Sequence, residues 1–527
     1  MPKTRPALLL LASANVANLF LARATARQDE VAVRVALGAG RARIARQLLT
    51  ESTLLTAAGA GLALVISLWS LEAVRVLAGG RVAGIQDATL DARVVAFMVV
   101  LALLVTLAFG LAPALQSGRV DLQTLMKSGA RAGVGREARR TRELLVVAQV
   151  ALAMVLLLGS GLLLRSYVEL RGVDPGFTVE HVYAVPLEVT EAAYEEYWQV
   201  SVFFRSAAAR IAALPGVVAA GAPTTEPFRD FRLVNDVTPV ERAAEVGPAG
   251  YLSADWRSVT RGYFDAAQVS LLQGRLFAET DTYEAPRVAV INAALAEGLW
   301  PGGDAVGRSV FWGGTDGDRI QVIGVVGNVR DFALDEPAPP MLFLSAYQLV
   351  MPTMTMLVRT RGEVSGLASS IRSAIWALNP GVAVPSVQSV EQYRTDALAR
   401  PRTQTTLLLC FALLALLVAA IGVYALVSYQ VALRRRELGI RHALGAQPHA
   451  LRILVLRRSA LLIAAGLALG VLAALALGRF VRALLYETAP NDPLSFIALP
   501  ALLALVAAYV PARRSATVDP LGVLRAD

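Results

Sequence analysis

The residues best placed to do chemistry are two pairs of opposite charges, one near each end of the chain. Glu30 precedes Arg34 by four residues, and Glu437 precedes Arg441 by the same spacing. On a helix, this spacing puts a carboxylate and a guanidinium one turn apart in the favourable order. An arginine presented by such a helix can contact lipid headgroups or dock a protein partner.

Both pairs belong to a longer motif that occurs twice, in residues 27–39 (RQDEVAVRVALGA) and 434–446 (RRRELGIRHALGA). Arg, Glu, Arg, Ala, Leu, Gly and Ala hold the same register in the two motif copies. Such a repeat predicts two copies of one module within the chain. The candidate site residues are Arg27, Glu30, Arg34 and Gly38 in the first copy and Arg434, Glu437, Arg441 and Gly445 in the second.

Two interpretations of this motif stay open. A basic helical elbow at the membrane surface can act as an anchor that only satisfies the topology of the chain. It can instead be the docking element for a cytoplasmic protein. Because charge-driven anchoring needs no fixed register, the repetition of one detailed pattern favours docking.

The composition predicts an integral membrane protein. Hydrophobic residues make up 55% of the chain and charged residues only 17%, and the apolar residues are clustered in runs long enough to span a bilayer as helices. Buried soluble helices are disfavoured because so many runs have interiors poor in charge. The predicted spans, about seven, are 54–78, 94–115, 143–164, 404–430, 458–481 and 494–511, with a shorter run at 7–22.

The distribution of arginine predicts the orientation of these spans. Arginine-rich segments are expected on the cytoplasmic side, which leaves the long segment 165–403, acidic on balance, outside the bacterial inner membrane. The formal charge of +9 then reflects cytoplasmic loops, and no nucleic-acid partner is expected. The predicted cytoplasmic segments are 23–53, 116–142, 431–457 and 512–527.

The beginning of the chain fits this topology poorly. The predicted alternation puts the N-terminus outside, whereas Lys3, Arg5 and the terminal amine favour the inside. Together with the short first run, this predicts that the first module lacks an upstream part.

The long outer segment combines helix and strand signals. Helical spacing followed by helix-stop residues predicts helices over 192–214, 293–300 and 364–378, and runs rich in β-branched residues predict strands over 287–292 and 320–326. This order predicts an α+β domain that can divide into two lobes. The chain has one cysteine, Cys410, so this domain must be held by its core without disulfides.

The repeated motif between two spans resembles that of MacB/FtsX-type ABC transporter permeases. Residues 13–23 (SANVANLFLAR) resemble the end of a helix in their duplicated subgroup, the duplicated orphan permeases. The outer segment is similar to a MacB-like core domain at several short motifs, namely Gly262-Tyr263-Phe264, residues 272–277 (LQGRLF), Val290-Ile291-Asn292, Trp300-Pro301-Gly302 and residues 324–330 (GVVGNVR).

This resemblance implies a permease driven by a separate cytoplasmic ABC ATPase that touches the helices within 27–48 and 434–455. Motion would pass along a helical stalk to the outer domain by mechanotransmission. The expected parts are a first FtsX-like module (1–116), a cytoplasmic linker (117–142), a membrane helix (143–164), a MacB-like extracytoplasmic core domain (165–403) and a second FtsX-like module (404–527).

Several activities are disfavoured by the sequence. It has no P-loop, and its only lysines are Lys3 and Lys127, so ATP hydrolysis is expected on a partner chain. No metal or other cofactor is expected. The Asp-rich segment 313–318 is interpreted as a hairpin turn and not as a calcium loop. The main alternative function is a non-transporting FtsX-type signalling or scaffold protein that regulates an extracytoplasmic partner, and a membrane-anchored enzyme is a third possibility without a supporting motif.

Overall fold

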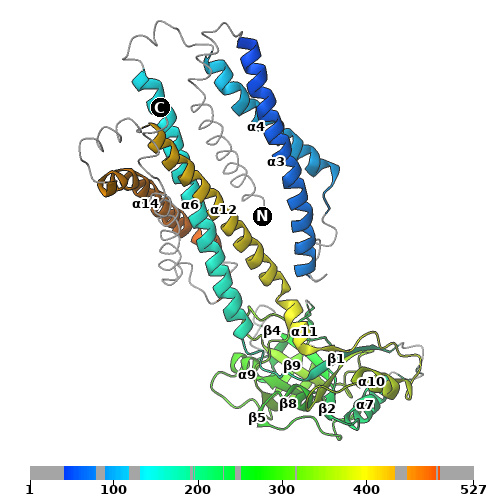
Figure 1. The fold of residues 1–527 in the computed structure, drawn as a ribbon. Coiled ribbons are helices and arrows are strands. Elements are labelled where there is room, and N and C mark those ends of the chain that lie inside the picture. Colours follow the sequence, from blue (N-terminus) through cyan, green and yellow to red (C-terminus); the bar gives the residue numbers. More distant parts are fainter. Residues whose placement is uncertain are drawn as a thin grey trace. The chain divides into compact units, whose positions relative to one another are not determined.

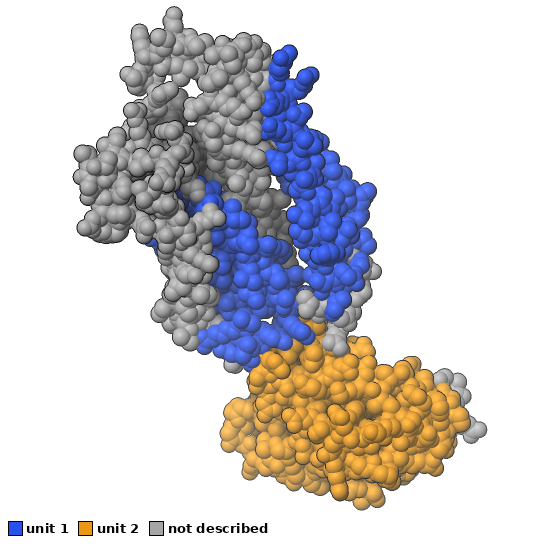
Figure 2. All heavy atoms as spheres, viewed as in Figure 1, with its two compact units in different colours: residues 1–169, 400–527 blue, residues 170–399 orange. Residues whose placement is uncertain are grey.

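The computed structural model describes residues 41–78, 89–117, 131–189, 194, 196, 198–229, 231–243, 251–314, 317–433, 448–481 and 485–486. The chain divides into two compact units (Figure 2). Unit 1 comprises residues 1–169 and 400–527, and unit 2 comprises residues 170–399.

Five long helices account for the described part of unit 1 (Figure 1). Four of them contain a stretch long and apolar enough to cross a membrane, namely Thr53–Val76, Glu143–Gly172, Ala399–Val427 and Ala460–Gly478. The predicted spans 7–22 and 494–511 lie outside the described residues, so the number of about seven stays a prediction. The helices are α3 (Arg41–Ala78), α4 (Ala92–Ser117), α6 (Arg131–Gly172), α12 (Ala399–Leu433) and α14 (Pro448–Val481).

Helices α3 and α4 contact each other but leave many large apolar side chains on their surfaces. Trp69, for example, is 76% exposed, and Leu54, Leu62 and Leu104 are also exposed. Water would disfavour this arrangement, since burial of apolar area stabilises a soluble fold by about 25 cal/mol per Å². A helix that is apolar on every side is typical of a membrane span.

Unit 2 contains a four-stranded antiparallel sheet with strand order β11-β1-β10-β2. Two helices, α7 (Trp198–Ala212) and α10 (Leu367–Trp376), lie next to each other (Figure 1) and bury Phe204, Ile211 and Ile371 in the core of this lobe. Both helices fall within ranges predicted from spacing. The strands are β1 (Val182–Glu188), β2 (Val217–Gly221), β10 (Thr353–Thr360) and β11 (Gln388–Ser389).

A mixed seven-stranded sheet forms the second lobe, with strand order β5-β8-β6-β9-β4-β3-β7. Strand β8 also pairs with β7, so six of these strands form a closed ring and β5 is added at its side. The β7–β8 pairing confirms the predicted hairpin, with Trp312 opposite Asp318. The strands are β3 (Val234–Pro239), β4 (Leu252–Val259), β5 (Leu271–Gly274), β6 (Val288–Asn292), β7 (Ser309–Trp312), β8 (Asp318–Val326) and β9 (Met341–Ser345).

Short helices complete unit 2, namely η2 (Val240–Arg242), α8 (Tyr263–Ala267), α9 (Ala293–Leu299) and α11 (Val390–Ala397).

The two lobes of unit 2 meet through close backbone contacts. At the lobe junction, a Cβ on Gly221 would lie 2.2 Å from the backbone nitrogen of Tyr263, and a Cβ on Gly262 would lie 2.2 Å from the carbonyl oxygen of Ala220. Only glycine allows the backbones to approach this closely. The predicted strands 287–292 and 320–326 correspond to β6 and β8, and the predicted helix 293–300 corresponds to α9.

Candidate functional site

The residues predicted to couple the chain to an ATPase all lie outside the described residues. These are Arg27, Glu30, Arg34, Gly38, Arg434, Glu437, Arg441 and Gly445. The structure does describe the helices on both sides of the second motif copy. These are α12, which ends at Leu433, and α14, which begins at Pro448. Both of these helices pack on α6.

Helix α14 lies against α6 through two glycines one turn apart. A Cβ on Gly466 would lie 2.7 Å from the Cβ of Val150, and a Cβ on Gly470 would lie 2.6 Å from the Cβ of Met154. It would also lie 2.7 Å from the carbonyl oxygen of Ala151. Small residues at this spacing let two membrane helices approach closely. Gly466 and Gly470 stand four residues apart in an apolar run, a spacing that fits a close helix contact or glycines merely tolerated in a membrane helix, and the structure shows the contact.

An ion pair joins the same two helices. Arg458 donates from Nε to Oε1 of Glu143 at 3.0 Å and from Nη2 to Oε2 at 3.2 Å. Two parallel N–H···O bonds of this kind fix orientation as well as distance. The pairs Glu143–Arg458, Val150–Gly466 and Met154–Gly470 advance together along both helices, so α6 and α14 run parallel and in register.

Helix α12 packs against α6 in the opposite direction. Leu408 lies 3.5 Å from the position of a Cβ on Gly159, and Thr405 donates to the carbonyl oxygen of Leu163 at 3.4 Å. Further along, bulky side chains of α6 meet alanines of α12. The shared core contains Val146, Val150, Met154, Leu157 and Leu158 from α6, Ala412, Ala415, Ala419 and Val423 from α12, and Ile463 from α14.

This three-helix bundle has a mechanical consequence. Both helices that flank the second motif copy pack on α6, and α6 runs unbroken to Gly172, at the start of unit 2. Close-packed interfaces transmit strain and do not deform continuously. Since the glycine contacts leave no free space, α14 cannot shift toward α6 without moving it.

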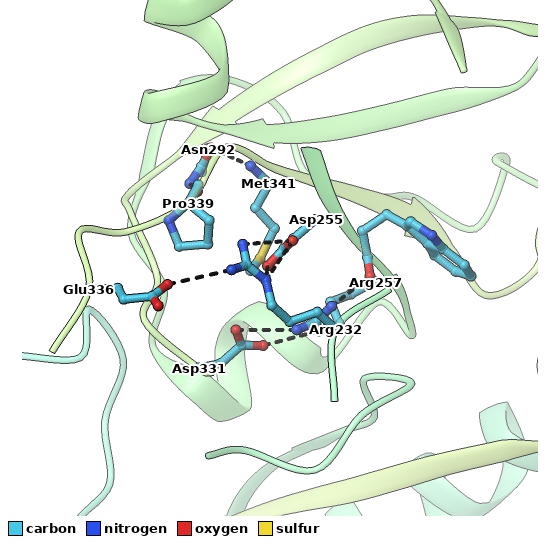
Figure 3. A network of polar contacts seen from close by, with 9 residues as sticks. Arg232, Asp255, Arg257, Asn292, Asp331, Glu336, Pro339 and Met341 are labelled. Atoms are coloured by element: carbon cyan, nitrogen blue, oxygen red, sulfur yellow. Dashed lines mark hydrogen bonds and ion pairs between the residues drawn. The ribbon is translucent and has the colours of Figure 1, made fainter. Parts of the chain in front are cut away.

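A network of buried charges occupies the second lobe of unit 2 (Figure 3). Arg257 of β4 is only 1% exposed and pairs with Asp331, with 3.1 Å between Nε and Oδ2. It also donates to the carbonyl oxygen of Trp256 at 2.8 Å. Burial raises the pKa of the neighbouring Tyr263 hydroxyl, and the Asp331 carboxylate raises it further. This ion pair anchors residues 327–340, which we call the β8–β9 loop, to strand β4.

Two more contacts hold the β8–β9 loop in place (Figure 3). Asp255 accepts from Arg232, with 3.0 Å between Oδ1 and Nη2, and Arg232 also reaches Glu336 of the loop at 3.5 Å. Asn292 accepts from the backbone N–H of Met341 at 2.9 Å and donates to the carbonyl oxygen of Pro339 at 2.8 Å. Every polar group of this network that we name has a partner, as buried charges require.

Sequence reasoning missed this network. Its one local signal is that Asp255 and Arg257 stand two residues apart in a strand and therefore lie on the same face. Within the described residues, no group of three or more His, Cys, Asp or Glu side chains could hold a metal ion. The arrangement of the network supports a structural role in fixing a loop and offers no free nucleophile or base.

Two families match the chain. The FtsX-like permease C-terminal family matches residues 7–122 and 409–520, and the MacB-like periplasmic core domain matches residues 146–392. The two permease matches contain the two motif copies. The core-domain match lies between them and covers α6 from residue 146 onward, both lobes of unit 2 and the first turn of α11.

Curated relatives include the macrolide export ATP-binding/permease proteins MacB 1/2 of Paracoccus denitrificans and MacB of Azoarcus sp. The first is 29% identical over 283 residues, which are 52% of this chain and 42% of the relative. The second is 27% identical over 270 residues, which are 48% of this chain and 40% of the relative. The matched region thus spans less than half the length of these relatives.

Two solved structures are also similar. The periplasmic region of MacB from Actinobacillus actinomycetemcomitans has 13% sequence identity and a TM-score of 0.28, and the match covers 42% of this chain and 93% of that chain. The extracellular domain of the noncanonic ABC-type transporter YknZ from Gram-positive bacteria has 15% identity and a TM-score of 0.26, and the match covers 39% and 98%.

Proposed function

Because the chain belongs to the MacB/FtsX-like ABC transporter permeases, we propose that it is a permease subunit that couples a separate cytoplasmic ABC ATPase to an extracytoplasmic domain. Members of this family are inner-membrane permeases with a periplasmic domain. Unit 2, which contains most of the core-domain match, would be that domain. The four apolar helices of unit 1 would cross the bilayer.

One observation carries this proposal. The second motif copy lies between α12 and α14, and both of these helices pack on α6. α6 and α14 run in one direction and α12 runs in the other, as required if the three helices cross the membrane one after another in alternating directions. A push on the motif from the cytoplasm would therefore reach α6 through the glycine contacts and the Glu143–Arg458 ion pair. The eight motif residues are the proposed docking surface for the ATPase.

The proposed partner, a cytoplasmic ABC ATPase, follows from the family to which the chain belongs. The sequence of the chain contains no Gly-rich phosphate loop ending in Lys-Ser or Lys-Thr, which ATP hydrolysis by an ABC ATPase needs. The similar MacB proteins are named as ATP-binding/permease proteins, so their names assign ATP binding and the permease function to one protein. In this system the ATPase would be a second chain. Export is the direction that the names of these relatives favour.

Charge reversal in both motif copies tests the docking role. We expect Arg34→Glu combined with Arg441→Glu to lower, at least tenfold, the degree to which the full-length protein stimulates ATP hydrolysis by its ATPase. The reason is that repulsion between like charges would replace charge-assisted contacts between the motif and the ATPase. The measurement is ATP hydrolysis by each candidate ABC ATPase, copurified with the permease and reconstituted in nanodiscs, together with the amount of ATPase retained.

The matched control is Arg140→Glu, an exposed arginine of α6 outside both motif copies. We expect it to change the stimulation less than twofold. If the control and the double reversal lower the stimulation equally, the arginines of the motif act only through net charge at the membrane surface. If neither variant changes binding or stimulation, the motif does not dock the ATPase.

A further inference from the structure

Within unit 2, a single arginine holds together the segment that enters the unit and the segment that leaves it. The incoming segment is the end of α6 and residues 173–178, and the outgoing segment is α11, directly before α12. Arg394 of α11 donates from Nη2 to the carbonyl oxygen of Arg171 and, at 3.4 Å, to the carbonyl oxygen of Val173. These two segments are more than 200 residues apart in the chain, since the bonds join positions 223 and 221 residues apart.

The chemistry of this contact suits a helix end. The last four carbonyl groups of a helix have no partner within the helix and carry partial negative charge. A guanidinium supplies several donors in one plane and stays charged at any working pH. The Arg394 side chain is 17% exposed and also lies 3.9 Å from Glu391. The Arg394 side chain therefore has contacts on two sides, so binding the two carbonyl oxygens costs less additional conformational entropy.

The incoming segment is fixed to the second lobe by backbone bonds. Arg330 donates its backbone N–H to the carbonyl oxygen of Pro175 at 2.8 Å, and Thr178 donates to that of Ala267 at 2.8 Å. Gly176 has a φ of +79°, and a Cβ at this position would lie 1.9 Å from the carbonyl oxygen of Asn328. Only glycine fits such a backbone contact.

The buried charge network supports this attachment from inside the lobe (Figure 3). Asp331 follows Arg330 and pairs with Arg257. Its carbonyl oxygen accepts from the backbone N–H of Phe228 at 2.5 Å, and the Phe228 ring lies 5.5 Å from the Phe177 ring of the incoming segment. The incoming segment thus rests on the β8–β9 loop, which is itself held by a buried ion pair.

The outgoing helix is attached to the same region. Burial raises the pKa of the Tyr393 hydroxyl, and the Glu226 carboxylate, which shares a hydrogen bond with it, raises the pKa further. Glu226 also pairs with Arg229 at 2.9 Å. Ser389 caps the start of α11 by accepting from the backbone N–H of Gln392 at 3.2 Å. Arg394 is therefore presented by a helix that is held at its start and along one side.

We propose that Arg394 is a positioning residue that clamps the end of α6 to α11, so that a displacement carried by α6 reaches both connections of unit 2 together. This inference rests on the proposed function, because a clamp of this kind matters only if α6 carries motion. Without it, the end of α6 could move while α11 stayed in place. The clamp makes the two connections one mechanical element.

A double-mutant cycle in the full-length protein tests the clamp without an ATPase. Arg458→Gln breaks the ion pair with Glu143 of α6, in unit 1, and the readout is hydrogen exchange in nanodiscs of the amides of Gln392 and Leu398, at the two ends of α11. We expect Arg458→Gln to raise their exchange at least threefold in the parent protein. In an Arg394→Met background, Arg458→Gln should produce no further rise.

Two further variants separate a clamp from a merely structural role. Arg394→Lys keeps one donor group near the two carbonyl oxygens and should preserve part of the response to Arg458→Gln. Arg372→Met removes an arginine of α10 that lies over the Trp376 ring, and it should leave the full response.

The clamp is wrong if Arg458→Gln raises exchange equally with and without Arg394, or if it leaves these amides unchanged in the parent protein. Arg394→Lys keeps the test valid should Arg394→Met fail to fold. Either contrary result leaves the proposed ATPase coupling standing, because ATPase stimulation by the motif copies is measured separately and does not depend on residue 394.

Discussion

Replacing Arg257 by methionine is expected to destabilise unit 2 by about 3–5 kcal/mol, the usual cost of removing one partner from a buried ion pair. Methionine would fill a similar volume but leave the Asp331 carboxylate without its partner in a site where Arg257 is only 1% exposed. The β8–β9 loop would then lose its anchor to β4. Thermal unfolding of the full-length protein in nanodiscs, combined with hydrogen exchange of the β4 and β9 amides, measures this effect.

The matched control is Arg287→Met. Arg287 pairs with Asp318 at 2.6 Å, but both side chains are about half exposed, and exposed pairs contribute only about 0–1 kcal/mol. A loss for Arg257→Met no greater than that of the control would contradict the structural role of the network. The double variant Arg257→Met with Asp331→Leu removes both charges, and it should recover part of the stability that the single variant loses.

Replacing Gly470 by leucine is expected to separate α14 from α6. Even the first atom of the new side chain would lie 2.6 Å from the Cβ of Met154 and 2.7 Å from the carbonyl oxygen of Ala151. Overpacking of a close interface costs roughly 1–3 kcal/mol and occasionally more. We expect a lower temperature of thermal unfolding, and faster hydrogen exchange in α14 and in the half of α6 that contacts it.

Gly59 provides the control for this variant, because it is the counterpart, after the first motif copy, of Gly466, which lies one turn before Gly470. A Cβ on Gly59 meets no atom within 4 Å. Gly59→Leu should therefore change stability by no more than about 0.5 kcal/mol. Equal losses at Gly59 and Gly470 would mean that the cost comes from the membrane or from the helix itself and not from the α6–α14 contact.

Much of the fold follows from local patterns in the sequence. The β-branched runs that form β6 and β8 are bounded by turn residues, and helices α7, α9 and α10 end at Pro-Gly or Asn-Pro signals close to their predicted limits. These elements are encoded by periodicity and by turn chemistry, both of which act over a few residues. The membrane character of α3, α6, α12 and α14 follows in the same way from run length.

The remaining features depend on pairs of residues far apart in the chain. The closure of β7 on β8 and the addition of β5 depend on which strands meet, and no local pattern specifies this. Arg257 and Asp331 are 74 residues apart, so their pairing could not be predicted from either segment alone. The spacing of Gly466 and Gly470 allows close packing of α14, but it does not specify α6 as the partner helix. The eight motif residues lie outside the described residues, and their docking role stays a prediction.

The most direct test of coupling is whether nucleotide in the cytoplasm changes the outer unit. The full-length protein would be copurified with its ABC ATPase, reconstituted in nanodiscs and compared by hydrogen exchange with and without ATP and vanadate. We expect nucleotide to change the exchange of amides at the start of unit 2, including Thr178 and Arg330, and the Arg34→Glu, Arg441→Glu protein to lack this change. Identical exchange throughout residues 170–399 in both states, with ATP hydrolysis intact, would contradict mechanotransmission by this chain.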